Sequence, residues 1–78
     1  MLKYKFNVLL ELKQKGYTTT KLRKEKILGE KTIQKLRHDN YVSMDTLDLL
    51  CGLLGCNISN LIEYVPDDRI IDDNNADD

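Results

Sequence analysis

The sequence has no tryptophan, one proline, one histidine and two cysteines, and it has no long apolar run. Nothing approaches the roughly 18 consecutive apolar residues that a membrane span needs. The opening MLKYKFNVLLELK is too charged for the apolar core of a signal peptide. We therefore expect a cytosolic protein with no membrane partner. Its 78 residues make one domain, near the lower limit for a core without disulfides or metals.

The cysteines and the histidine leave little for metal or catalytic chemistry. Cys51 and Cys56 lie five residues apart in CGLLGC, which is neither a zinc pair nor a redox C-x-x-C. We interpret them as reduced residues that pack in the core. His38 has no nucleophile or orienting acid at a characteristic spacing, and no phosphate-binding glycine loop or paired-carboxylate signature is present. We expect no enzyme activity, no metal, no cofactor and no small-molecule ligand.

The net charge of −1 conceals two parts of opposite sign. Residues 1–66 carry 11 Lys and Arg against 7 Asp and Glu, whereas residues 67–78 carry one arginine against six aspartates. In residues 3–37 the same 11 basic residues stand against three glutamates. We predict a folded domain over 1–66 and an acidic, disordered tail over 67–78, because the tail has little to bury. A localised basic surface is a feature of polyanion binding.

Apolar periodicity predicts five short helices. They are expected from about Phe6 to Gly16, from a Thr18–Thr20 cap to about Lys26, within 28–40, from Ser43 to Gly55, and from Asn57 through Ile62. Gly52 lies inside the fourth helix, where glycine costs about 1 kcal/mol relative to alanine. Residues 1–6 alternate apolar residues with lysines, as a strand or an extended arm would.

The stretch LGEKTIQKLRHDN, residues 28–40, has two chemically different helical sides. One side carries Glu30, Lys31, Gln34, Lys35 and His38, and the other carries Ile33 and Leu36. Helices this short are marginal alone, so packing must hold them. Two brief helices joined by a tight turn, with a basic outer face on the second, are typical of a helix-turn-helix. In that motif the second helix enters the DNA major groove.

From Phe6 to Pro66 the sequence resembles the Cro/C1-type (Xre-like) helix-turn-helix family of bacterial and phage regulators. The resemblance rests on TTKLRKEKILGEKTIQKLR and on VSMDTLDLLCGLLGCNISNLIEYVP, which looks like the family's last two helices. The family's four apolar motif positions are occupied by Leu22, Leu28, Ile33 and Leu36. The resemblance implies an all-α, compact five-helix, lambda-repressor-like domain that binds double-stranded DNA in the cytoplasm. The implied role is a transcriptional regulator, either a repressor or, as a subtype, an antitoxin that represses its own operon.

Two positions depart from the family pattern. Arg23 stands where the family favours alanine, and we expect its stem to cover the crossing of the two helices with its head in solvent. Ile27 stands where the family favours glycine, and a β-branched residue is an outlier at positive φ. We therefore expect the second helix to run longer or the turn to differ.

The resemblance also assigns individual site residues. Lys31, Gln34 and Lys35 match the outward, base-reading positions of the recognition helix, while Thr32 is turned more toward the core. Glutamine can bond an adenine edge with both amide atoms, and lysine can reach guanine or phosphate. Glu30 either accepts from cytosine or, as we prefer, complements the helix N-terminus. The residues expected at DNA phosphates are Thr18, Thr19, Arg37 and His38.

Two function hypotheses of different class follow from these observations. The first is a sequence-specific regulator of transcription. The second is a protein-interaction module of the same fold with an unused DNA face, which the acidic tail would favour by mimicking or repelling DNA. We also expect a weak homodimer, or a monomer that dimerises on a palindromic site. Its expected surfaces are the apolar residues of the fifth helix (Leu61, Ile62, Tyr64) or the N-terminal segment.

Overall fold

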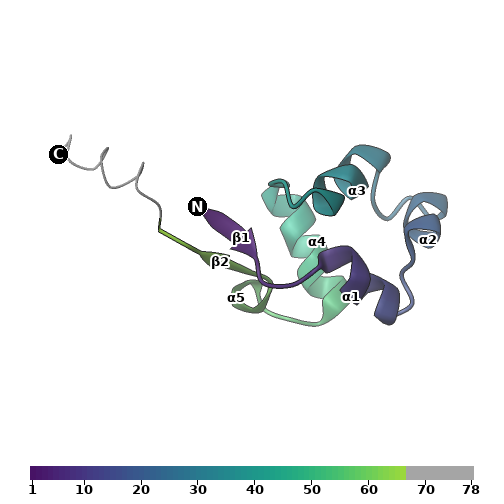
Figure 1. The fold of residues 1–78 in the computed structure, drawn as a ribbon. Coiled ribbons are helices and arrows are strands. Elements are labelled where there is room, and N and C mark those ends of the chain that lie inside the picture. The colour runs from purple at the N-terminus through teal and green to yellow at the C-terminus, as the bar shows by residue number, and fades with distance from the viewer. Residues whose placement is uncertain (67–78) are drawn as a thin grey trace.

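A computed structural model describes residues 1–66, which form five helices and two short strands (Figure 1). In order these are β1 (Leu2–Tyr4), α1 (Val8–Gln14), α2 (Thr19–Lys24), α3 (Glu30–Arg37), α4 (Met44–Leu54), α5 (Ile58–Leu61) and β2 (Ile62–Tyr64). The five expected helices are confirmed, with shorter bounds. The acidic tail, residues 67–78, lies outside the described residues. Within residues 1–66, no helix has the length and apolar character needed to cross a membrane.

Side-chain caps begin three helices, two of them at positions predicted from the sequence (Thr18 and Ser43) and one, Asn7, that was not predicted as a cap. The capping oxygens belong to Asn7, Thr18 and Ser43, and each accepts the backbone N–H of the residue three places later at 3.2 Å. At the other end, α4 stops at Gly55, which has a left-handed conformation with φ 66°. Local hydrogen bonding therefore fixes where these elements begin and end.

The core is one cluster of nine aliphatic side chains from all five helices and the turn between α2 and α3. Its members are Val8, Leu12, Leu22, Leu28, Ile33, Leu36, Leu50, Leu54 and Leu61. The packing role expected for the four apolar motif positions is thus confirmed. Because α2 and α3 are shorter than about 12 residues, this packing is what keeps them helical.

The two cysteines occupy the edge of this core. Cys51 and Cys56 are free thiols, half-buried and packed against the core cluster. Burial raises the pKa of the Cys51 thiol, and the neighbouring Cys56 raises it further. A protonated thiol is a poor nucleophile and a poor metal ligand, so a packing role fits Cys51.

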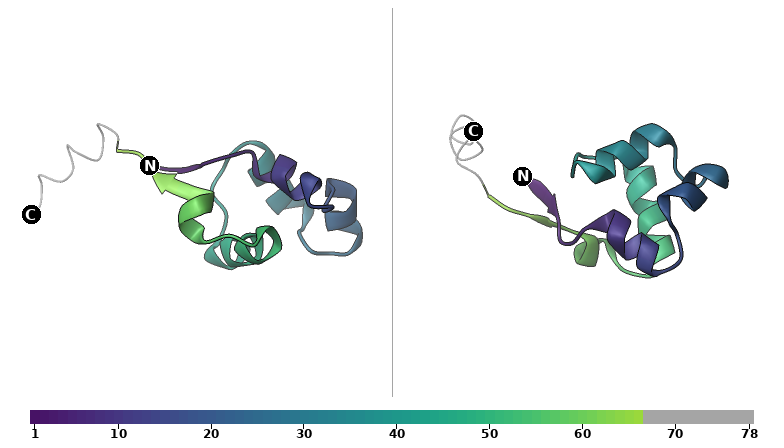
Figure 2. Two further views of the ribbon diagram at one scale, coloured as in Figure 1. Left: turned by 90° about the horizontal axis from the view of Figure 1, so that it is seen from below. Right: turned by 45° about the vertical axis from the view of Figure 1, so that its right-hand side comes forward.

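The fold is not all-α, because β1 and β2 form a two-stranded antiparallel sheet. The facing pairs are Leu2 with Tyr64, Lys3 with Glu63, and Tyr4 with Ile62. Beyond the strands, the Lys5 N–H donates to the Leu61 carbonyl at 2.9 Å. The sheet lies at the opposite end of the helical body from α2 (Figures 1 and 2). Of the two interpretations of residues 1–6, the strand is confirmed.

The fifth helix and the expected dimer surfaces need correction. Ile62 does not continue α5, because its backbone is extended (ψ 163°) and it begins β2. Leu61 is 0% exposed, so it belongs to the core and is not available to a second copy. Tyr64 and the N-terminal segment lie in the same sheet. The two surfaces proposed as alternatives are therefore parts of one surface.

Gly52→Ala is expected to stabilise the protein. Gly52 is exposed within α4, and a Cβ placed on it would have no neighbour within 4 Å, so no close approach requires glycine. Better helix propensity should raise the free energy of unfolding by up to about 1 kcal/mol, measured by urea unfolding. Gly55→Ala is the matched control, because positive φ strains an alanine there and should lower the urea midpoint. Equal shifts of the two variants would contradict this account.

Candidate nucleic-acid interface

The turn between α2 and α3 adopts one of the two expected solutions. α2 ends at Lys24 and does not run longer, but the turn differs, because Lys26 and not Ile27 takes positive φ (57°). The N–H groups of Ile27 and Leu28 both donate to the Leu22 carbonyl, at 2.9 and 3.3 Å. This closes the turn and places Leu28 in the core. The β-branched residue thereby avoids the strained conformation.

α3 has a buried side and an outward side. Ile33 and Leu36 are buried, and Thr32 and Gln34 are half-buried. At about 100° per residue, the outward arc of roughly 140° contains Glu30, Lys31, Gln34, Lys35 and His38. Lys31 and Lys35 in this arc are exposed. The helix therefore places four of the five residues expected at bases on one face, with Thr32 nearer the core.

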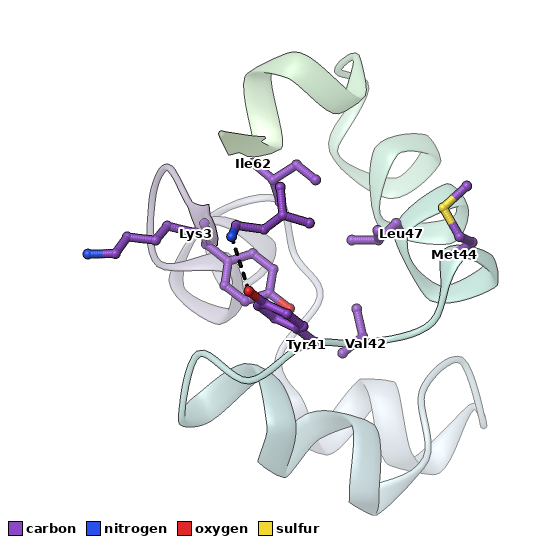
Figure 3. Close-up of a pocket in the computed structure, with 8 residues that line it drawn as sticks. Lys3, Tyr41, Val42, Met44, Leu47 and Ile62 are labelled. Atoms are coloured by element: carbon purple, nitrogen blue, oxygen red, sulfur yellow. Dashed lines mark hydrogen bonds between the residues drawn. The ribbon is translucent and has the colours of Figure 1, made fainter. Parts of the chain in front are cut away.

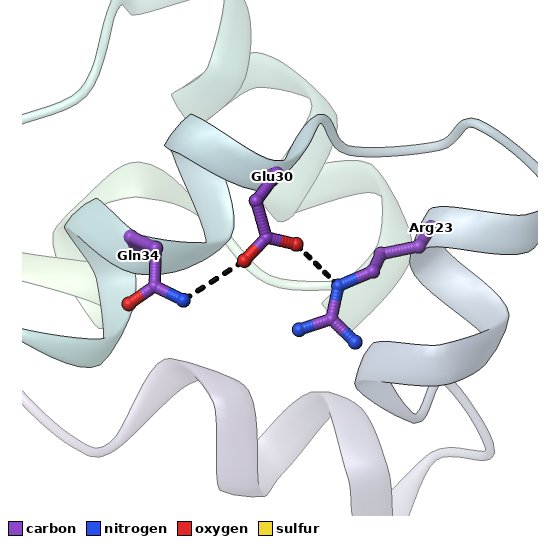
Figure 4. A network of polar contacts seen from close by, with 3 residues as sticks. All are labelled: Arg23, Glu30 and Gln34. Carbon is purple, nitrogen blue, oxygen red and sulfur yellow. Dashed lines mark hydrogen bonds and ion pairs between the residues drawn. The ribbon is translucent and has the colours of Figure 1, made fainter.

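Glu30 connects α2 to α3 through a network of three side chains (Figure 4). One carboxylate oxygen accepts a hydrogen bond from Arg23 Nε in α2, and the other accepts from Gln34 Nε2 at 2.9 Å. Contrary to expectation, the Arg23 head is not left to solvent alone, although 42% of its side chain is exposed. The pair was not predicted, because the angle at which two helices cross cannot be derived from one sequence.

These hydrogen bonds change the titration of Glu30. The bond from Gln34, followed by the bond from Arg23, lowers the pKa of the carboxyl below its ordinary value. The charged form is therefore favoured in the folded state. Since the folded pKa is the lower one, the stabilisation is present at neutral pH and is lost as the pH falls through that folded value. Both side chains are exposed, so its contribution to stability is small.

A second group of expected site residues lines a surface hollow between α1, the start of α2 and the end of α3. Thr18, Thr19 and Arg37 lie there together with Lys13 of α1. The Thr18 oxygen accepts the Lys21 N–H as a helix cap, yet its hydroxyl proton remains free to donate. His38 is exposed at the C-cap of α3 and does not line this hollow. Three of the four residues expected at phosphates are thus brought together.

Two further residues of the candidate interface were not predicted as site residues from the sequence. Lys13 reaches the hollow from α1, and only the basic excess of residues 3–37 gave a general signal for it. Arg23 was noticed as a departure from the family pattern, but its bond to Glu30 was not predicted. Both depend on how separate helices pack, which a local pattern does not encode.

Two short packed helices with a tight turn, the second presenting a polar and basic outer face, define a helix-turn-helix DNA-binding fold. The family of Cro/C1-type HTH DNA-binding domains matches residues 7–67, and the chain belongs to this family. The assignment made from the sequence is therefore confirmed. Membership of this family implies that the domain binds double-stranded DNA. Comparison with curated proteins and with solved structures gave no match.

Proposed function

We propose that this protein is a sequence-specific regulator of transcription that binds double-stranded DNA and acts as a repressor. The observation that carries the proposal is the outward face of α3, where Lys31, Gln34 and Lys35 stand opposite a buried Ile33. An amide and two flexible cations can bond base edges in a major groove that admits one helix. Repression requires only that the bound domain occupy its operator.

The hollow that contains Thr18, Thr19 and Arg37 supports the same proposal. Hydroxyls and a guanidinium are donors suited to phosphate oxygens, and Lys13 adds a second cation. Such contacts fix the register of a protein on the duplex and carry no sequence information. In this proposal the outward face of α3 reads the bases, and the residues of the hollow position the protein on the duplex. Substitutions in these two groups of residues should therefore have different effects on DNA binding.

The test is selection from a random-duplex library, followed by titration of the selected duplex and of a scrambled duplex at several salt concentrations. We expect preference for one sequence, and log K that falls linearly with log salt with a slope of about −0.9 per phosphate contacted. No binding to any duplex at low salt would refute the proposal. That outcome would favour the alternative, an interaction module of the same fold.

The proposal includes a homodimer. One recognition helix reads few base pairs, and paired half-sites lie about 34 Å apart on the duplex. Support for a surface comes from an apolar hollow of about 210 Å³ between the sheet and the start of α4 (Figure 3). Its lining residues are Leu2, Lys3, Tyr4, Tyr41, Val42, Met44, Leu47 and Ile62. At its rim the Met44 side chain is 81% exposed.

We take a second copy of the chain as the occupant of this hollow. A two-fold axis brings the same patch of both copies together, so the exposed Met44 of each copy can lie against the apolar hollow of the other.

Met44→Glu is expected to shift sedimentation of the protein toward the monomer and to weaken binding to a palindromic duplex more than to a single half-site. The cause is a charge placed in the apolar contact, without loss of fold because Met44 is largely exposed. Ile58→Glu is the matched control: Ile58 is 45% exposed in α5 and does not line the hollow. A strict one-to-one complex of the wild type on a site without dyad symmetry would contradict the dimer.

A further inference from the structure

The Gln34 side chain is oriented by a partner on its own helix. Its Nε2 donates to Glu30 Oε2 at 2.9 Å, and the second oxygen of Glu30 is held by Arg23 from α2 (Figure 4). A carboxylate accepts hydrogen bonds and donates none, so the amide nitrogen, not the amide oxygen, must face Glu30. The two ends of the Gln34 amide are therefore distinguished before any ligand arrives.

This bond changes what Gln34 can offer to a base. A glutamine amide has two N–H donors and one acceptor oxygen. Glu30 takes one donor, which leaves one N–H and the oxygen. Adenine presents a donor, N6–H, beside the acceptor N7, whereas guanine presents the two acceptors O6 and N7. One donor with one acceptor matches adenine, and it lacks the second donor that guanine would require.

We propose that Glu30 is a specificity-determining residue that acts through Gln34, fixing its amide so that it prefers adenine over guanine. The inference rests on the proposed function, because it concerns how α3 reads DNA. Both carboxylate oxygens of Glu30 are engaged by side chains of the protein, so we assign Glu30 to positioning a reader and not to reading cytosine. Arg23 supports this arrangement by neutralising a carboxylate that would otherwise repel the duplex.

The test measures base preference across all single-base variants of the selected duplex, for the full chain and three single variants. In the wild type we expect adenine to be preferred over guanine at one base pair, and Gln34→Ala should remove that preference. Glu30→Ala should reduce the adenine-to-guanine ratio at the same base pair by about five-fold or more, since a bidentate match is worth at least that factor. Preferences at other base pairs should stay as in the wild type.

Glu25→Ala is the control for charge. Glu25 is an exposed acid at the end of α2, and its removal changes the net charge as Glu30→Ala does without touching Gln34. It should leave the adenine-to-guanine ratio unchanged. Melting curves show whether each variant is folded, which we expect because the Arg23–Glu30 pair is exposed and its loss costs little.

The double variant Glu30→Ala/Gln34→Ala separates positioning from direct reading. If Glu30 acts through Gln34, adding Glu30→Ala to Gln34→Ala changes the base profile no further. A Glu30 effect that persists without Gln34, or one that is equal at every base pair, would overturn the inference. A wild type that binds no duplex would refute the proposed function itself. A selective wild type whose profile survives Gln34→Ala would refute only this inference.

Discussion

Ile33→Ala is expected to lower the free energy of unfolding by about 2–5 kcal/mol, the largest effect of any substitution considered for this chain. Ile33 is 0% exposed and lies on the buried side of α3, within a core of nine side chains. A core this small has few neighbours that can shift to fill the cavity. Small domains have little stability in reserve, so a large fraction of this variant should be unfolded near physiological temperature. Urea and thermal unfolding measure the change.

Two further substitutions control for the chemistry of this change. Ile33→Val removes one methylene and should cost about 0.5–1.5 kcal/mol. Ile58→Ala removes the same atoms as Ile33→Ala from a side chain that is 45% exposed, and should cost less than the core substitution. DNA binding by Ile33→Ala should return on cooling to temperatures where the variant is folded. A folded Ile33→Ala that still failed to bind would show that Ile33 does more than pack.

The parts of the fold that were predictable are those fixed by neighbouring residues. Thr18 and Ser43 cap helices through bonds to backbone three residues away, and Gly55 ends α4 by its own conformation. The spacing of Ile33 and Leu36 sets the buried side of α3, so the outward face followed directly from the sequence. Local rules therefore gave the third helix and its outward face, whereas the resemblance to the family implied which residues on that face read bases.

The parts that were not predictable depend on distant segments. β1 pairs with β2 across about 60 residues of chain, and three-residue strands have too little alternation to reveal a partner. The spacing of Ile62 from Ile58 and Leu61 is typical of a helix, but its pairing with Tyr4 holds its backbone extended. The Arg23–Glu30 bond likewise depends on the angle between α2 and α3. Each of these features depends on a tertiary contact that a local sequence pattern does not encode.

Gln34→Ala is expected to cost about 1–3 kcal/mol of binding at one base pair and to relax selectivity there. Gln34 is half-buried on the outward side of α3, and its removal leaves Glu30 paired with Arg23, so no carboxylate is orphaned in the interface. Titration of single-base operator variants measures this effect. Melting curves must show a folded variant, which we expect because the Gln34 side chain is outside the core cluster.

Arg37→Ala is the matched comparison, because it belongs to the hollow with Thr18 and Thr19 and not to the reading arc. A lost phosphate contact weakens all duplexes alike and flattens the slope of log K against log salt by about one unit. Thr19→Ala should also weaken all duplexes alike, but with little change of slope, since a hydroxyl releases no counterion. Base selectivity and salt slope thus report on two separate groups of residues. If Gln34→Ala flattened the slope and left the base profile intact, α3 would be touching the backbone through that residue, and the division between reading and positioning would be wrong.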